Sequence, residues 1–325
     1  MKRIPMTRSH GEYLAHQLIS SMMNCSGVKI GFNSSKRPSR NKQKRRKGMA
    51  LDPQAQWVLD IAEEKGLPSL DEMTPDEAKA AYEERALTLT FKDVDIGKTM
   101  DIDIPGPNGN VPIRIYHPVG MTDPLPVLVY YHGGGWVIGS RDTHDSLCRL
   151  IANSGPFVVV SVDYRMGPEA PFPAAVEDSV AALNWTASNI ADYNGDPDRI
   201  AVGGDSAGGN LSAVVCLVAR EENTYMPTFQ WLIYPATSMD MTTPSHEKFA
   251  EGYFLTRSLM EYFQGHYLKN EADKIDWRAS PLLAESLAGL PPALIQTAGF
   301  DPLQDEAIAY GERMNKKAAS DAYPL

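Results

Sequence analysis

The pentapeptide Gly-Asp-Ser-Ala-Gly at residues 204–208 has the residue types and spacing that can make a serine nucleophilic. It matches G-x-S-x-G, in which the serine sits on a sharp turn between a strand and a helix. A strand-like run at 199–202 precedes it, and small residues that suit a helix follow from Ala207. Glycines are needed where a β-carbon would clash, and a helix N-terminus favours developing negative charge. The pattern predicts Ser206 as a nucleophile, with a glycine-rich turn and a capping serine as the alternative.

A second motif, His-Gly-Gly-Gly at residues 132–135, directly follows an apolar run that ends in two tyrosines. Acyl transfer requires N–H donors about 3 Å from the oxygen that becomes negative, and losing one donor costs roughly 3 kcal/mol. Three glycines let backbone amides face a substrate without side chains in the way. We predict Gly134, Gly135 and Ala207 as the donors. His132 could instead be a metal ligand or a core histidine, but no HExxH or second ligand supports a metal, so no metal or cofactor is expected.

These motifs need a scaffold, and the rest of the chain alternates strand-like and helix-like patterns. Residues 50–87 have helical spacing, and an antiparallel hairpin is expected where 94–104 and 111–116 alternate apolar and polar residues around a Gly-Pro-Asn-Gly-Asn turn. Short apolar runs are typical of central parallel strands, and helical runs separate them. The strand-like runs are 126–131, 157–162, 200–202, 229–234 and 293–297, and the helical runs include 176–189 and 206–220. This alternation predicts an α/β fold with a mostly parallel sheet and flanking helices.

Several motifs in this order resemble the bacterial hormone-sensitive lipase family of α/β-hydrolase carboxylesterases. The resemblance extends over nearly all of residues 50–318. It rests on segments 130–136 (YYHGGGW), 162–169 (VDYRMGPE), 172–175 (FPAA), 203–210 (GGDSAGGN) and 290–292 (LPP). It implies an α/β-hydrolase fold with a helical cap, formed here by about 50–87 and 239–274. It also implies a triad acid within Asp-Pro-Leu-Gln-Asp-Glu at 301–306, so Asp301 is our predicted acid and Asp305 the less favoured choice.

The base of the triad has no counterpart in this sequence. In α/β-hydrolases the order is serine, acid, histidine, and the family's histidine follows the acid by more than the 24 residues found here after Asp301. Those residues contain no histidine, and the last one in the chain is His266. We therefore expect a C-terminal truncation that removes the family's final strand and helix. Because serine without a base is a poor nucleophile, we expect this form to hydrolyse esters weakly or not at all.

Composition divides the chain near Met49. Residues 1–48 hold twelve basic residues against the single Glu12, whereas the body is strongly acidic, and the whole chain of 325 residues carries a net charge of −10. We expect 1–48 to be a disordered basic extension and 49–325 the hydrolase domain. No apolar run is long enough for a membrane span. Three cysteines without paired spacing favour a reducing compartment, so a cytoplasmic location is expected.

The sequence thus predicts a serine carboxylesterase that acts on short to medium acyl esters through an acyl-enzyme, impaired in this form. The alternative is a non-catalytic member of the same fold that binds a small ligand, although Ser206 and Asp301 would then be needless. The expected partner is a small-molecule ester. We expect no nucleic-acid binding by residues 49–325. For the basic extension at 1–48, nucleic-acid binding stays an alternative. The oligomeric state, a homodimer included, is left open.

Overall fold

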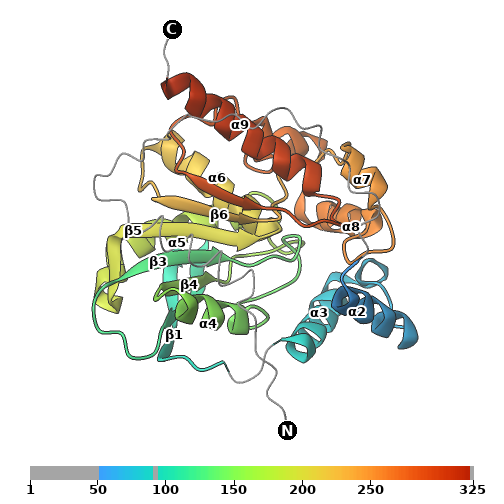
Figure 1. Cartoon of the computed structure of the whole chain (residues 1–325), viewed down its shortest axis with the longest axis horizontal. Helices are drawn as coiled ribbons and strands as arrows, with labels where there is room; N and C mark the ends of the chain where they lie inside the picture. Colours follow the sequence, from blue (N-terminus) through green and yellow to red (C-terminus); the bar gives the residue numbers. More distant parts are fainter. Residues whose placement is uncertain (1–50, 91–93, 323–325) are drawn as a thin grey trace, which may run out of the picture.

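The structure is a computed structural model that describes residues 51–90 and 94–322 (Figure 1). At its centre lies one sheet whose seven described strands follow the order β1-β2-β4-β3-β5-β6-β7. β1 pairs antiparallel with β2, β2 pairs antiparallel with β4, and the other neighbours are parallel. The strands are Lys98–Gly106 (β1), Gly109–His117 (β2), Leu125–Tyr131 (β3), Val158–Val162 (β4), Gly195–Asp205 (β5), Phe229–Ile233 (β6) and Ala293–Gln296 (β7). The predicted α/β architecture is confirmed.

The strands form where the hydrophobic pattern predicted them. β3 and β4 are buried along their whole length, as their uninterrupted apolar runs require for a central position. In the hairpin of β1 and β2, Ile104 pairs with Val111 and Gly106 with Gly109, so a two-residue turn joins the strands. β1 begins at Lys98 rather than at Val94, which shortens the predicted strand at its start.

Helices cover both faces of the sheet. Cys148 and Ala152 of α4 pack with Tyr130 of β3 on one face, whereas Tyr131, the next residue of that strand, packs with residues of α5 and α6 on the other. The helices are Pro53–Glu64 (α2), Pro75–Leu89 (α3), Asp145–Ser154 (α4), Ala174–Asn189 (α5), Ala207–Glu222 (α6), Pro244–Lys248 (α7), Arg257–Tyr267 (α8) and Gln304–Ala322 (α9). Short 3₁₀ helices lie at Leu70–Glu72, Ile190–Tyr193, Glu271–Ile275 and Pro281–Leu283.

The two segments expected to form a cap lie together at one end of the sheet (Figure 1). α3 begins after Thr74, which forms a reciprocal capping box with Glu77. Ala78 of α3 packs with Leu259 and Phe263 of α8, and this cluster includes Val137 and Ile138 from the loop after β3. α3 and α8 therefore rest on the chain that follows the glycine triplet.

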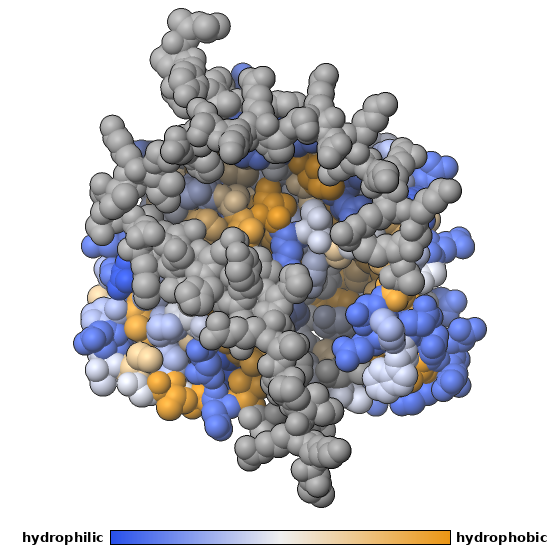
Figure 2. Space-filling view, viewed as in Figure 1, coloured by the Kyte–Doolittle hydropathy of each residue, from blue (hydrophilic) through white to orange (hydrophobic). Residues whose placement is uncertain are grey.

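In the space-filling view, hydrophilic residues cover much of the visible surface of the described residues, and apolar residues show between them, several of them near the upper middle of this face (Figure 2). No helix in 51–90 or 94–322 is long and apolar enough to cross a membrane. The basic segment 1–48 and the boundary placed at Met49 lie outside the described residues.

Candidate active site

Ser206 occupies a strained turn between β5 and α6. Its backbone has φ 53° and ψ −115°, a conformation that costs a non-glycine residue about 1–3 kcal/mol. Three backbone hydrogen bonds hold the turn: its N–H donates to the Ile233 carbonyl of β6 at 2.8 Å, and its carbonyl accepts from the N–H groups of Asn210 at 3.0 Å and Ala236 at 3.3 Å. A β-carbon at Gly208 would overlap the Tyr131 carbonyl oxygen. The predicted strand-to-helix turn is therefore present, and it displays Ser206 at the carboxyl end of the sheet.

The glycine triplet forms a tight loop at the end of the neighbouring strand. β3 lies beside β5, with Tyr131 paired to Gly204, so the loop starts next to the Ser206 turn. The carbonyl of Gly134 accepts from the N–H groups of Val137 at 3.1 Å and Ile138 at 2.9 Å. Gly135 has φ 59°, and a β-carbon there would overlap the ring of Phe263 on α8. The loop can approach α8 because this position carries no side chain.

Ser206 and Gly135 line the same cavity, of about 50 Å³. The other lining residues are mainly apolar and come largely from the segment 236–264: Trp136, Ala236, Ser238, Met239, Met241, His246, Leu255, Met260, Phe263, Gln264 and Leu303. Gly134 and Ala207 each adjoin a lining residue in the chain, and Ala207 is fully buried at the first position of α6. The cavity thus brings Ser206, the glycine loop and a mainly apolar lining together, an arrangement that suits attack on the carbonyl of a short acyl group.

Asp301 lies between β7 and α9, at the same carboxyl edge of the sheet. Its Oδ1 accepts from the N–H of Leu303 at 2.9 Å, and Leu303 lines the cavity. Burial raises the pKa of its carboxyl. Asp301 is not among the described residues that line the cavity, so its role as the acid stays a prediction. Asp305 accepts from the Ser245 N–H at 2.8 Å and ties α9 to α7.

Sequence reasoning missed a buried histidine and glutamate at this cavity. His246 lines it, and its Nδ1 lies 2.7 Å from Thr243 Oγ1. The Nε2 atom lies 3.3 Å from Glu306 Oε2, and both side chains are fully buried. Burial lowers the pKa of His246 and raises that of Glu306 to about 8, and both shifts favour the neutral form of the side chain. Glu306 could have been suspected, because Leu303, Ala307 and Tyr310 place it on the buried face of α9.

Replacing Glu306 with glutamine is expected to reduce the pH dependence of stability. The unfolded carboxyl has a pKa near 4.5 and the folded one about 8. The stabilisation that the Glu306 carboxyl gives the folded state is therefore complete below pH 4.5 and is lost as the pH rises toward 8. Glutamine has no proton to lose, and its oxygen can still accept from the Thr237 and Ser238 N–H groups, as Glu306 does. Between pH 5 and pH 8.5, the melting temperature should fall less for Glu306→Gln than for the unchanged chain.

The matched control for this experiment is Glu312→Gln, an exposed position on the same helix. It should keep the pH dependence of the unchanged chain. Equal pH dependence in all three proteins would show that Glu306 is already ionised in the folded state.

The chain shares its fold and much of its sequence with known hydrolases. A family model described as the alpha/beta hydrolase fold matches residues 128–323. The carboxylic ester hydrolase LipN of Mycobacterium tuberculosis is 45% identical over 287 residues, which is 86% of this chain and 75% of that protein. This chain belongs to the bacterial hormone-sensitive lipase family of α/β-hydrolases. As a member of that family it is a carboxylic ester hydrolase.

Further relatives agree with this assignment. An arylesterase of Saccharolobus solfataricus is 36% identical and aligns over 82% of this chain and 86% of its own length. Among solved structures, the ester hydrolase EH1AB1 from the Lake Arreo metagenome superimposes with a TM-score of 0.80 at 41% identity. The hyperthermophilic esterase of Pyrobaculum calidifontis gives 0.79 at 39%. These two comparisons cover 82% and 83% of this chain, and 86% of each neighbour.

Proposed function

We propose that Ser206 is the nucleophile that hydrolyses short acyl esters through a covalent acyl-enzyme once a general base is present. The observation that carries the proposal is that Ser206, on its strained turn, and Gly135 face one small apolar cavity. The hydroxyl oxygen attacks the ester carbonyl carbon, and the carbonyl oxygen becomes an oxyanion. The amides of Gly134, Gly135 and Ala207 would stabilise that charge. The alcohol leaves with a proton, and water then releases the acid and restores the serine.

The step that limits this chain is removal of the hydroxyl proton. No histidine follows Asp301 within the 325 residues. His246 is the histidine at the cavity, but its two ring nitrogens face Thr243 and Glu306. In subtilisin, loss of the histidine costs about 10⁶ in kcat, and the remaining site still exceeds water by roughly 10³–10⁴. We propose that the 325-residue chain works at this residual level, supported by its oxyanion donors and its pocket.

The pocket supports a preference for short acyl chains. A small cavity of about 50 Å³, lined by Met260 and Phe263 among other apolar residues, favours short acyl groups over long ones. Both residues belong to the segment 239–274, which we propose acts with 50–87 as a cap over the acyl group. Leu255 lines the same cavity and is only half-buried.

Chain-length dependence tests this proposal. The 325-residue chain should hydrolyse p-nitrophenyl acetate and butyrate above the buffer rate, and p-nitrophenyl octanoate several-fold more slowly. Leu255→Ala should narrow the difference, because removing the isobutyl group enlarges the pocket. Initial rates of nitrophenol release, corrected for the buffer blank, are the measurement. A faster rate with octanoate would contradict the pocket assignment.

A second candidate is a member of the fold that binds a small ligand in the same mainly apolar cavity without turning it over. In that case the chain would bind butyrate esters, as seen by a ligand-induced rise in melting temperature, without releasing nitrophenol above the blank. It would also stay inactive when a histidine is supplied, which separates this candidate from an impaired esterase.

A further inference from the structure

One carboxylate joins the Ser206 turn to the glycine loop. Asp205 immediately precedes Ser206 on β5 and is largely buried. Its Oδ1 accepts from the Gly133 N–H at 3.0 Å and from the Tyr130 hydroxyl at 2.7 Å. Gly133 is the residue before the two loop glycines proposed as oxyanion donors. The direction in which those amides point is therefore linked to the position of this carboxylate.

His144 supplies the third contact to the same oxygen. Its Nε2 lies 3.4 Å from Asp205 Oδ1, and the side chain is about 9% exposed. The imidazole comes from the residue just before α4. Its ring lies 5.5 Å from that of His132. Three groups from three segments thus converge on one oxygen of Asp205.

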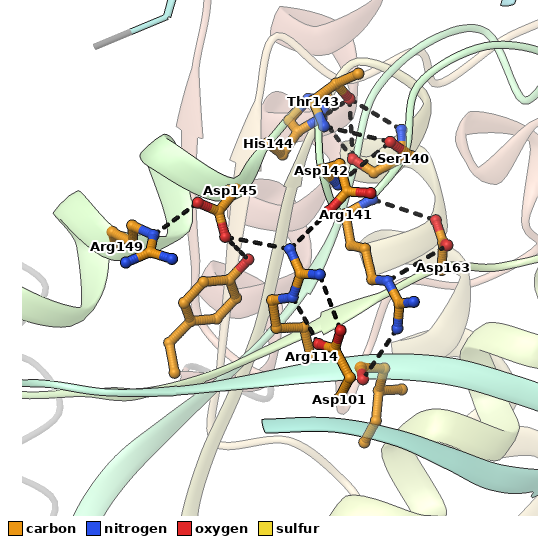
Figure 3. Close-up of polar contacts among 12 residues, drawn as sticks. Asp101, Arg114, Ser140, Arg141, Asp142, Thr143, His144, Asp145, Arg149 and Asp163 are labelled. Carbon is orange, nitrogen blue, oxygen red and sulfur yellow. Dashed lines mark hydrogen bonds and ion pairs between the residues drawn. The ribbon is translucent and has the colours of Figure 1, made fainter. Parts of the chain in front are cut away.

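The backbone around His144 is fixed by polar contacts that reach the molecular surface (Figure 3). The Nδ1 atom of His144 lies 2.9 Å from Thr143 Oγ1 and 3.3 Å from the Ser140 carbonyl oxygen. Arg114 of β2 donates to Asp142 at 2.7 Å and to Asp145 at 3.3 Å, which are the positions flanking this pair. The imidazole is thereby oriented toward Asp205 before any substrate arrives.

Among the histidines around Asp205, His144 is the one whose pKa is raised, which favours its charged form. Burial lowers the pKa of His132 to about 3, which keeps that imidazole neutral. Burial also raises the pKa of the phenols and the thiol that face the carboxylate, so they stay protonated: Tyr82, Tyr130, Tyr164, Tyr234 and Cys148. For His144 and Asp205 burial disfavours both charges, but their mutual attraction outweighs it, raising the pKa of His144 and lowering that of Asp205.

We propose that His144, as an imidazolium paired with Asp205, is a positioning residue that holds the oxyanion loop in its productive orientation. The geometry that carries this is the single oxygen shared by His144 Nε2, the Gly133 N–H and the Tyr130 hydroxyl. When His144 loses its proton, the carboxylate keeps its charge but loses its cation. A conformation in which water solvates the Asp205 carboxylate then becomes more favourable, and the hydrogen bond from the Gly133 N–H weakens.

The direction of the pH effect follows from the raised pKa of His144. A histidine whose pKa is raised by folding stabilises the folded arrangement fully below about 6.5, its unfolded value. That contribution is lost as the pH rises through the raised value. Order in the loop, and any catalysis that depends on its amides, should therefore decline on the alkaline side.

The test compares His144→Gln and His144→Phe with the unchanged 325-residue chain, and His117→Gln serves as a control histidine at the end of β2. Hydrogen exchange of the 131–136 backbone, expressed as protection factors from pH 6 to 9, measures the order of the loop without substrate. The rate of hydrolysis of p-nitrophenyl acetate measures how well the loop amides stabilise the oxyanion. We expect His144→Phe to lose about tenfold in protection and in rate, which is less than the 10²–10³ of a deleted donor.

Glutamine can still donate to Asp205 but cannot titrate. His144→Gln should therefore recover most of the protection at pH 6 and lack the alkaline decline that the unchanged chain shows. Wild-type protection in the Phe variant would overturn the proposal. So would equal losses in both variants together with a lower melting temperature, since that indicates a structural role alone. If the chain released no nitrophenol at all, the esterase proposal would fail, and hydrogen exchange would still decide the role of His144.

Discussion

A chimera that continues this chain with the histidine-bearing C-terminal segment of a related esterase is expected to gain at least about 10³-fold in kcat for p-nitrophenyl butyrate. The expectation rests on the subtilisin comparison, in which the serine and histidine act as a unit worth about 10⁶. Here the strained turn already displays Ser206, and Asp301 lies at the same edge of the sheet. The added histidine would supply the base that the proposed mechanism requires.

Ser206→Ala provides the control for that gain. In the chimera it should remove nearly all of the added activity. In the 325-residue chain it should change the residual rate little, because a serine without a base contributes almost nothing. A large effect of Ser206→Ala in the 325-residue chain would reveal a base that the structure does not identify. An inactive chimera that is folded and still binds esters would favour the ligand-binding candidate.

Gly135→Ala is expected to lower kcat by about 10²–10³ in the active chimera, comparable with the loss of an oxyanion donor elsewhere. The new methyl group would overlap the ring of Phe263, and the φ of 59° disfavours alanine in any case. The loop must move away from α8, which displaces the amide from the developing oxyanion. The KM should change less than kcat, since the donor acts mainly in the transition state.

Gly120→Ala is the matched control, because Gly120 also has a positive φ, of 73°, and no atom lies within 4 Å of the added methyl group. It carries the same kind of backbone strain in a turn outside the site. If the two variants lost activity equally, strain alone would account for the effect, and the steric link between the loop and α8 would be wrong.

Much of the fold was predictable because the signals are local. The uninterrupted apolar runs of β3 and β4 require burial on both faces, and the capping box at Thr74 marks the start of α3. The strand–turn–helix context of Ser206 was likewise contained in ten consecutive residues. The boundary of β1 was missed because Val94 and Ile96 continue the alternation of the strand before pairing with β2 begins.

The polar contacts of the site could not be predicted, since they join residues far apart in the sequence. His144 and Asp205 are separated by 61 positions, and nothing near either residue indicates that they meet. His246 and Glu306 are 60 positions apart. Their pairing depends on how α7 packs against α9, which is a property of the assembled fold. Asp301 was assigned through resemblance, and its role as the acid remains a prediction.

The acyl pocket has a chemical vulnerability that follows from its lining. Met239, Met241 and Met260 all line it, and Met241 is the one of the three that is partly exposed to solvent and so to oxidants. Peroxide converts a thioether into a sulfoxide, which is larger and strongly polar. In oxidised chains the pocket would be narrower and more polar and would accept apolar acyl groups less well. Storage under reducing conditions, or exchange of these methionines for leucine, should preserve the pocket.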